Sequence, residues 1–446
     1  MVVSHRLGFI TTMSPIEGEA DKAEHRMKAA ISNLRQLPLE LVTADSVVSS
    51  QADALKVAAR LRENNIDALA IMAANWTNDA VLLSVINTLR VPVLLWAIPY
   101  PATYSIPIVQ HVASVLREIG VKYRYVYGEP SDRHVAELVF EFAKIASAAK
   151  NLKAARIGLV GPRPTWRVAG PADTTYDEID ISRKLGCEIV HVDTGMLMSE
   201  IQRVSDEEAR RTIHKMKDAG LLGNVEVEDT VLLGAVKSYV AIKNVIVNLG
   251  LDGVAIECYP EHLGLTCLAA SWLADEGTVV GCEGDVGSTI VAMIMQRLAS
   301  TPAVIIEPFW VDESNNRLLI GHPCGSGAIS LAESNEKVHL RPSKPEGGVF
   351  VQFPIKPGQV TLANISGRPG TYRMFIATAR SIELTPDEWS RIGGIAASIK
   401  FEEDAKAVMD RVIQEGIDHH WVTVLGDLRN ELTLLCELLD IRPVLV

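Results

Sequence analysis

The chain has 446 residues, of which 48% are hydrophobic and 22% are charged, and its formal net charge is −12 at pH 7. This length exceeds what one hydrophobic core usually supports, so we expect two or three domains. The acidic balance argues against a nucleic-acid partner and against an anionic membrane surface.

The first predicted domain covers residues 1–153, in which short apolar strands alternate with amphipathic helices. Strands are predicted at 7–11, 39–42, 67–72 and 92–96, and helices at 21–34, 52–63 and 77–89. This alternation predicts a parallel sheet with helices on both faces. Asn75 and Trp76 follow the third strand, at the sheet edge where small ligands bind in such folds, although loop packing is the alternative for the aromatic ring.

A second α/β domain is predicted at 154–300, beginning with a strand at 156–161. The loop after this strand contains Arg163 and Arg167. Their guanidinium groups are suited to hydrogen-bond a polyol or an anionic substituent of a substrate. Pairing with acids across a domain interface is the alternative, and the sequence does not decide between the two.

Carboxylates end two apolar strands of this second domain. Glu257 follows the strand at 254–256, and Glu283 and Asp285 follow the strand at 278–282. Because the carboxyl ends of parallel strands meet at one sheet edge, we expect these acids to form a cup of negative charge. Mn²⁺ or Mg²⁺ would suit carboxylate oxygens. A solvated strand end at Glu257 and a helix cap at 283–285 are the alternative.

The last predicted domain, 301–446, consists of short β runs separated by turn residues, which predicts an antiparallel, barrel-like fold. His322 follows one β run, and His419 and His420 open another. Consecutive side chains of a strand point to opposite faces, so one of this pair is expected at the site. An imidazole would complete a mixed oxygen and nitrogen coordination sphere.

The order of these motifs resembles the L-arabinose isomerase and L-fucose isomerase superfamily. The segment P-G-Q-V-T-L at 357–362 and the tail H-H-W-V-T-V at 419–424 also resemble motifs of that group. The resemblance implies two doubly wound parallel-sheet α/β domains followed by a β-rich, barrel-like C-terminal domain. It also implies Mn²⁺ as cofactor, with Mg²⁺ or Co²⁺ as substitutes, and a trimer or hexamer with the active site at a subunit interface.

The resemblance also assigns roles to individual residues. Glu257 would bind the metal and act as acid or base. Asp285 matches the fucose-isomerase pattern and Glu283 the arabinose-isomerase pattern, so the choice of second ligand and proton-transfer group stays open between them. His420 would be the C-terminal ligand, with His419 as the alternative.

The substrate side is assigned in the same way. His322 matches a Gly-x-His position but is followed by residues that depart from the family, so we place it with the substrate-binding residues. Trp76 would form a substrate wall for a neighbouring subunit. Asn75, Arg163 and Arg167 are further candidate substrate-binding residues, chosen for their chemistry and not from the resemblance.

The expected activity is aldose–ketose isomerisation of a free sugar through an enediol, with deoxy-aldoses and aldoses bearing a C6 phosphate or sulfonate among the candidates. A metal-dependent sugar lyase or aldolase and a non-catalytic sugar-binding protein are the alternatives. Six cysteines without a C-x-x-C pair and an N-terminus without the pattern of a signal peptide predict a cytoplasmic protein.

Overall fold

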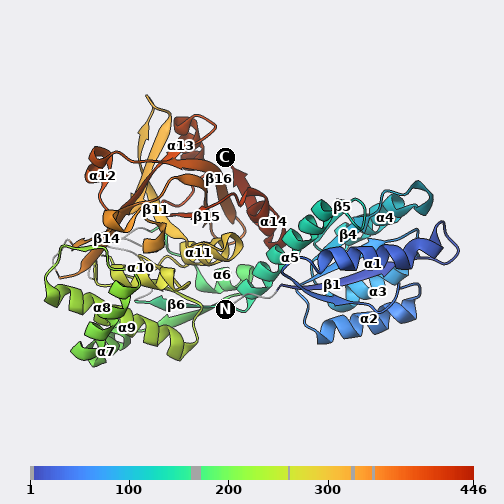
Figure 1. The fold of residues 1–446 in the computed structure, drawn as a ribbon, viewed down its shortest axis with the longest axis horizontal. Helices are drawn as coiled ribbons and strands as arrows, with labels where there is room; N and C mark the ends of the chain where they lie inside the picture. Colours follow the sequence, from blue (N-terminus) through green and yellow to red (C-terminus); the bar gives the residue numbers. More distant parts are fainter. Residues whose placement is uncertain (1–4, 162–171, 260–261, 323–326, 344–346) are drawn as a thin grey trace. The chain divides into compact units, whose positions relative to one another are not determined.

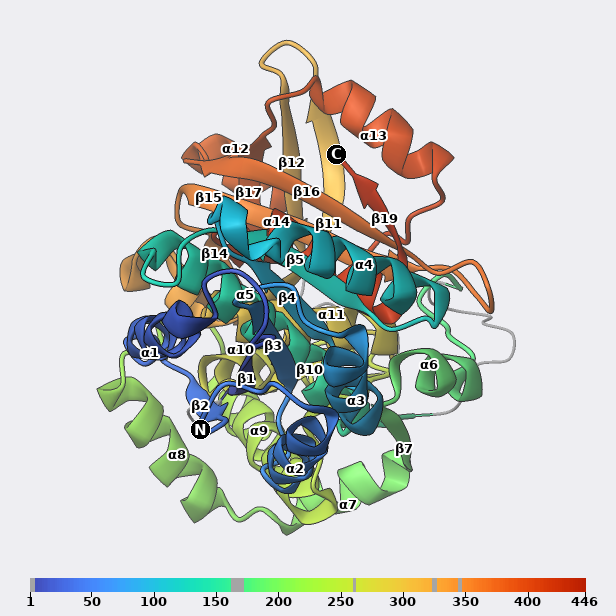
Figure 2. The same ribbon diagram turned by 90° about the vertical axis from the view of Figure 1, so that its right-hand side faces the viewer.

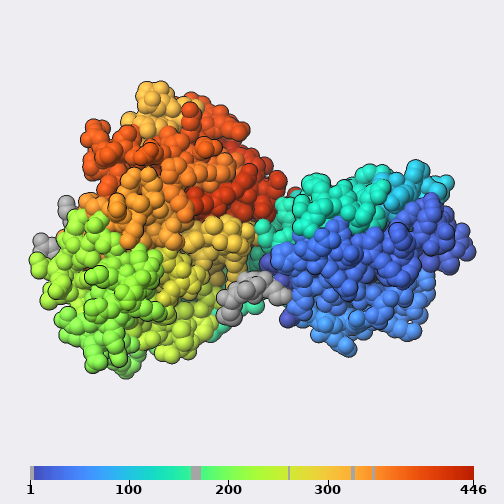
Figure 3. Space-filling view, viewed as in Figure 1, coloured from blue at the N-terminus to red at the C-terminus, as the bar shows by residue number. Residues whose placement is uncertain are grey.

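The computed structural model describes residues 5–161, 172–259, 262–322, 327–343 and 347–446. The chain forms two compact units, Met1–Asn151 (unit 1) and Leu152–Val446 (unit 2). Each unit has its own cluster of buried apolar side chains, and Figure 3 shows the surface residues of each unit coloured along the sequence. The predicted boundary near residue 300, inside unit 2, stays a prediction.

Unit 1 is a five-stranded parallel sheet in the order β2-β1-β3-β4-β5, as the alternating pattern predicts. Its helices cover both faces of the sheet (Figure 2). The central strands β3 and β4 are buried along their whole length, which explains their continuous apolar sequence. The strands are β1 (Arg6–Thr12), β2 (Glu40–Thr43), β3 (Ala68–Ala73), β4 (Val93–Ala97) and β5 (Tyr123–Tyr127). The helices are α1 (Ala23–Leu34), α2 (Gln51–Glu63), α3 (Asp79–Leu89), α4 (Ser105–Glu118) and α5 (Arg133–Lys153).

Unit 2 begins with a second parallel sheet, in the order β10-β9-β6-β7. The strand order reverses between β6 and β9, and ligands collect at such a switch point in open α/β sheets. The strands are β6 (Arg156–Val160), β7 (Glu188–Val192), β9 (Gly253–Ile256) and β10 (Val279–Gly281). The helices are α6 (Glu178–Leu185), α7 (Thr194–Arg203), α8 (Asp206–Asp218), α9 (Asp229–Leu249), α10 (Cys267–Asp275) and α11 (Val286–Ala299).

The rest of unit 2 is a ten-stranded mixed sheet in the order β19-β16-β15-β18-β11-β12-β17-β14-β13-β8. The strands are β8 (Asn224–Val225), β11 (Val304–Asp312), β12 (Arg317–His322), β13 (His339–Pro342), β14 (Val349–Pro354), β15 (Gly358–Ser366), β16 (Arg373–Ile382), β17 (Ile395–Lys400), β18 (Trp421–Leu425) and β19 (Arg442–Leu445). Helices α12 (Pro386–Ile392), α13 (Ala405–Gln414) and α14 (Arg429–Leu439) flank it (Figure 1).

The prediction for this part of the chain is confirmed in its β-rich character and only partly matches the arrangement of the strands. The sheet is not a simple closed barrel: the pairing of β16 with β17 joins six strands through antiparallel pairs, and β19, β14, β13 and β8 extend the sheet beyond them. It is also mixed rather than antiparallel, since β14 runs parallel to β17 and β19 runs parallel to β16. Pairings between strands far apart in the chain decide both points, and turn residues alone do not reveal them.

Helix α11 connects the two sheets of unit 2. It packs against β9 and β10 on one side and against β15 and β18 on the other. Its residues are therefore buried almost throughout. Since α11 begins right after β10, this packing brings the carboxyl end of the parallel sheet next to strands of the mixed sheet.

Helix α9 is long and apolar enough to cross a membrane by length and composition, and 56% of its most apolar window is buried inside the structure. It packs against α7, α8 and α10. This burial is typical of a helix in the core of a globular domain.

Candidate metal centre

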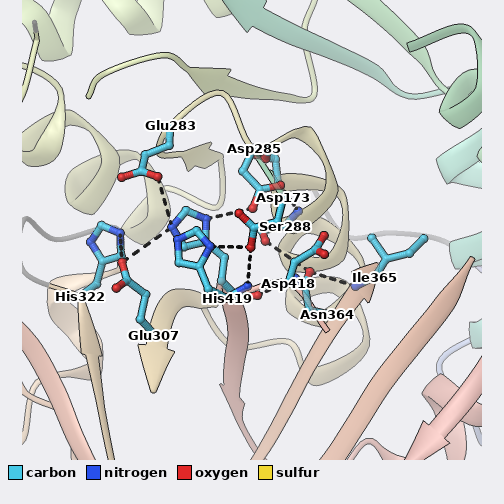
Figure 4. Close-up of polar contacts among 12 residues, drawn as sticks. Asp173, Glu283, Asp285, Ser288, Glu307, His322, Asn364, Ile365, Asp418 and His419 are labelled. Atoms are coloured by element: carbon cyan, nitrogen blue, oxygen red, sulfur yellow. Dashed lines mark hydrogen bonds and ion pairs between the residues drawn. The ribbon is translucent and has the colours of Figure 1, made fainter. Parts of the chain in front are cut away.

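Four potential metal-binding side chains converge where the parallel sheet of unit 2 meets β11, β12 and β18 (Figure 4). Glu283 lies two residues beyond β10, Glu307 is in β11, His322 ends β12, and His420 directly precedes β18. Strand register explains the last three positions. Glu307 pairs with Gly321, the neighbour of His322, and the preceding Ile306 pairs with Trp421, the neighbour of His420.

His420 is at the centre of this cluster. Its Nε2 atom lies 3.9 Å from Glu283 Oε2 and 3.8 Å from Glu307 Oε1, and His322 Nε2 lies 3.8 Å from the same Glu307 oxygen. Metal–ligand bonds of about 2.0–2.2 Å place donor atoms roughly 3–4 Å apart. These side chains form two overlapping donor groups that share His420, namely Glu283 with His419 and Glu307 with His322, and the spacing within each group suits a divalent ion.

Asp285 holds the His420 ring from behind. Its Oδ2 atom lies 2.9 Å from His420 Nδ1, and its Oδ1 accepts a hydrogen bond from the backbone N–H of Ser288 at 2.9 Å. Asp285 is thus both the N-cap of α11 and the partner of the imidazole. A carboxylate on Nδ1 fixes the tautomer in which Nε2 carries the lone pair, as in many metal-binding histidines.

The same contacts change the acidity of His420. Burial opposes its charged form, but the hydrogen bond to Asp285 and the charges of Asp285, Glu283 and Glu307 prevail and raise the pKa of His420 to about 9. Without a metal, the imidazole is therefore protonated at neutral pH. A cation that binds at Nε2 must displace this proton.

Glu283 is held in an unusual backbone conformation. Its φ of 56° is left-handed, as is that of the following Gly284, and the Gly284 N–H donates to the carbonyl of Ile256 at 3.0 Å. Left-handed conformations of non-glycine residues cluster at functional sites. Burial raises the pKa of Glu283 to about 7, against the opposing charge of His420.

His419 lies beside this cluster and is held by hydrogen bonds to Asp173. Its Nδ1 and its backbone N–H lie 2.8 Å and 2.9 Å from Asp173 Oδ2. The ring centroids of His419 and His420 are 4.3 Å apart, and His419 forms a second possible donor group with Glu283 and His420. Because both histidines precede β18, the alternation expected for strand residues does not apply to them.

Several residues of this site escaped the sequence analysis, namely Asp173, Tyr176, Glu307 and Asp418. The Tyr176 hydroxyl lies 2.7 Å from both Asp418 Oδ2 and the carbonyl of Ile365. Burial is the main reason that the pKa of Asp418 is raised to about 6. Glu307 had one detectable signal, since it is a single acid between the apolar run 303–306 and the aromatic pair 309–310.

Glu257 follows β9 at the switch point, where its backbone N–H donates to Val160 at 2.8 Å. Gly161 approaches it so closely that an added Cβ would lie 2.6 Å from the Cβ of Glu257. Its side chain lines a small pocket with Thr194 and His262. Among the described residues it belongs to neither donor group, so its metal-binding role stays a prediction.

The other predicted substrate residues are placed only in part. Arg163 and Arg167 lie outside the described residues. In unit 1, the buried Asn75 side chain accepts a hydrogen bond from the N–H of Ser14 and donates to the Ser14 and Gly18 carbonyls, so it shapes the loop after β1. Trp76 is 38% exposed, and its role as a substrate wall stays a prediction.

Comparisons with known proteins agree with the motifs. A sequence profile of the N-terminal domain of fucose and sulfoquinovose isomerases matches residues 17–104. The sulfoquinovose isomerase of Alkalicoccus urumqiensis is 23% identical over 392 residues, which cover 85% of this chain and 86% of that protein. The sulfoquinovose isomerase of Priestia aryabhattai is 21% identical over 415 residues, or 90% of each chain. The chain is therefore similar to sulfoquinovose isomerases over most of its length, and its N-terminal part matches the fucose and sulfoquinovose isomerase family.

Proposed function

We propose that this protein is a divalent-metal-dependent aldose–ketose isomerase. The observation that carries the proposal is a pair of donor groups that share His420, one with Glu283 and His419 and one with Glu307 and His322. The chain's relatives, matched over most of their length, are named sulfoquinovose isomerases. Sulfoquinovose is an aldose with a sulfonate at C6. An aldose with an anionic C6 substituent is therefore our first candidate substrate.

The donor set fits a divalent ion of intermediate hardness. Two carboxylates and two imidazoles suit Mn²⁺, with Mg²⁺ and Co²⁺ as weaker or substitute occupants. His420 Nε2 is buried and has no hydrogen-bond partner among the described residues, as expected of an atom prepared for a ligand bond. When bound, the ion polarises the sugar carbonyl and stabilises the negative charge that develops on the two neighbouring oxygens.

The chain must also move a proton between two carbons. Isomerisation removes the proton from C2 of the aldose, passes through an enediol, and returns a proton to C1. We assign this transfer to Glu257, which lies at the switch point of the sheet. Asp285 is assigned to positioning His420, because both of its carboxylate oxygens are already hydrogen-bonded.

Two further features follow from the resemblance and belong to the same proposal. We propose a cytoplasmic homo-oligomer, a trimer or a hexamer, in which Trp76 of one subunit forms part of the substrate wall of another. Mass photometry of the purified protein tests the assembly. A stable monomer with full activity would contradict it.

Turnover on a panel of aldoses tests the activity directly. The panel pairs each neutral sugar with its C6 phosphate or C6 sulfonate, and products are identified by NMR after EDTA treatment and after Mn²⁺ addition. The proposal predicts one ketose of unchanged mass, formed only with the metal. Two smaller products would indicate a lyase, and binding of sugars without conversion would indicate a sugar-binding protein.

A further inference from the structure

Unit 2 contains a second polar cavity, built from residues other than those of the metal centre. Its volume is about 430 Å³, which lies in the range of small-molecule sites. Its walls come from the end of α5, from α6, from the segment before β16 and from the end of α14. The lining residues are Lys153, Asp180, Arg183, Lys184, Gly370, Tyr372, Leu438, Leu439 and Asp440.

Two buried polar atoms of this cavity, one oxygen of Asp180 and the hydroxyl of Tyr372, are without a well-formed hydrogen bond. Asp180 is 5% exposed and Tyr372 is 6% exposed. Neither Asp180 Oδ2 nor the Tyr372 hydroxyl has a partner with hydrogen-bond geometry among the described residues. The two groups face each other, and a weak hydrogen bond to the Asp180 carboxylate adds to the effect of burial in raising the pKa of Tyr372. Buried polar atoms without partners are rare in folded proteins, and a ligand with hydroxyl groups would satisfy both.

The lysine and arginine side chains around these two groups make few hydrogen bonds with the rest of the protein. Arg183 donates one hydrogen bond to Asp180 Oδ1 at 2.6 Å, and Lys184 donates to the carbonyl of Asp440 at 2.7 Å. Within the described parts of the chain, the ammonium group of Lys153 makes no hydrogen bond or ion pair. Lys153 and the remaining N–H groups of Arg183 are therefore available to an anionic group.

We propose that this cavity binds a small hydroxylated anion, such as a hexose phosphate or a sugar sulfonate. The anionic group would contact Lys153 and Arg183. Sugar hydroxyls would donate to Asp180 and exchange hydrogen bonds with Tyr372, and the apolar ring face would lie against Leu438 and Leu439. This site is separate from the metal centre and does not depend on the proposed isomerase activity.

Isothermal titration of the full-length protein at low ionic strength tests this site. The probes are glucose 6-phosphate, glucose 6-sulfonate, free glucose and inorganic phosphate, added to the EDTA-treated H420A variant so that the metal centre does not contribute. We expect one of the two anionic sugars to bind more tightly than glucose and phosphate. The better of the two identifies the anionic group.

Three variants of the H420A protein locate the binding. K153Q/R183Q should weaken binding of the anionic sugar roughly tenfold or more, because two charged contacts are lost. Tyr372→Phe should weaken binding of the sugar but not that of inorganic phosphate. Arg391→Gln removes an exposed arginine of α12 and should change nothing. Absence of binding at millimolar concentration, or equal binding by K153Q/R183Q, would overturn the proposal.

Discussion

Replacement of Asp285 by Asn tests how His420 is prepared for a metal. The Asp285 carboxylate accepts from His420 Nδ1 and from Ser288 N–H, both at 2.9 Å. Asn has one oxygen for these two donors, so its amide NH₂ must face one of them. If the NH₂ group faces His420, it donates to Nδ1, so the imidazole proton moves from Nδ1 to Nε2. The nitrogen that would bind the metal is then blocked. Asn remains a good N-cap, so α11 should stay intact.

The expected loss of Mn²⁺ affinity follows from the place of the Asp285–His420 hydrogen bond, on the ring nitrogen opposite the one that would bind the metal. Loss of such a partner typically costs about 10–100-fold in metal affinity, or about 1.4–2.7 kcal/mol. Mn²⁺ titration followed by electron paramagnetic resonance should show this change, and saturating Mn²⁺ should restore most of the turnover. Asp404→Asn, which alters the N-cap of the distant α13, is the matched control. An unchanged Mn²⁺ affinity would refute the reasoning, and a loss of turnover that Mn²⁺ does not restore would make Asp285 a catalytic group.

Three other predictions concern the same site. Glu257→Gln should abolish isomerisation while Mn²⁺-bound protein keeps its melting temperature, and near-normal turnover would remove Glu257 from proton transfer. Glu307→Gln should weaken Mn²⁺ binding by at least about tenfold, measured as above, whereas equal affinity would place Glu307 outside the metal centre. Without metal, the raised pKa values of Glu283 (4.5 to about 7) and His420 (6.5 to about 9) mean that the folded state holds extra protons, so stability should fall as the pH rises from about 4.5 to about 9. Mn²⁺ affinity should rise over the same pH range, because the bound ion displaces those protons. Calorimetry in buffers of different ionisation enthalpy should detect the protons released. An Mn²⁺ affinity that does not depend on pH would contradict this prediction.

The sequence predicted the two parallel sheets well, because their strands are short apolar runs between helices. In β3 and β9, for example, every residue is buried, and this leaves a clear signal in the sequence. The mixed sheet was predicted less well. Its topology depends on the pairing of β14 with β17 and of β16 with β19, and local patterns do not encode such long-range partners.

The candidate site shows the same division between local and long-range information. The sequence analysis named Glu283 and His420 because each lies next to the end of an apolar strand, and their metal-binding role stays a prediction. Glu307 was missed because it becomes a neighbour of His420 only through the pairing of β11 with β18. Asp285 was expected to bind metal, and this role stays a prediction; in the structure it contacts His420 Nδ1, and no spacing rule separates a ligand from a residue that positions one.

The most direct test of the central claim is a Mn²⁺ titration of the EDTA-treated protein in which bound manganese and ketose formation are measured together. We predict no ketose without metal, and activity that rises in proportion to bound Mn²⁺ until one ion is bound per chain. His420→Ala should lose both signals. Full activity of the metal-free protein, or tight Mn²⁺ binding by the His420→Ala variant, would contradict the assignment of the metal centre.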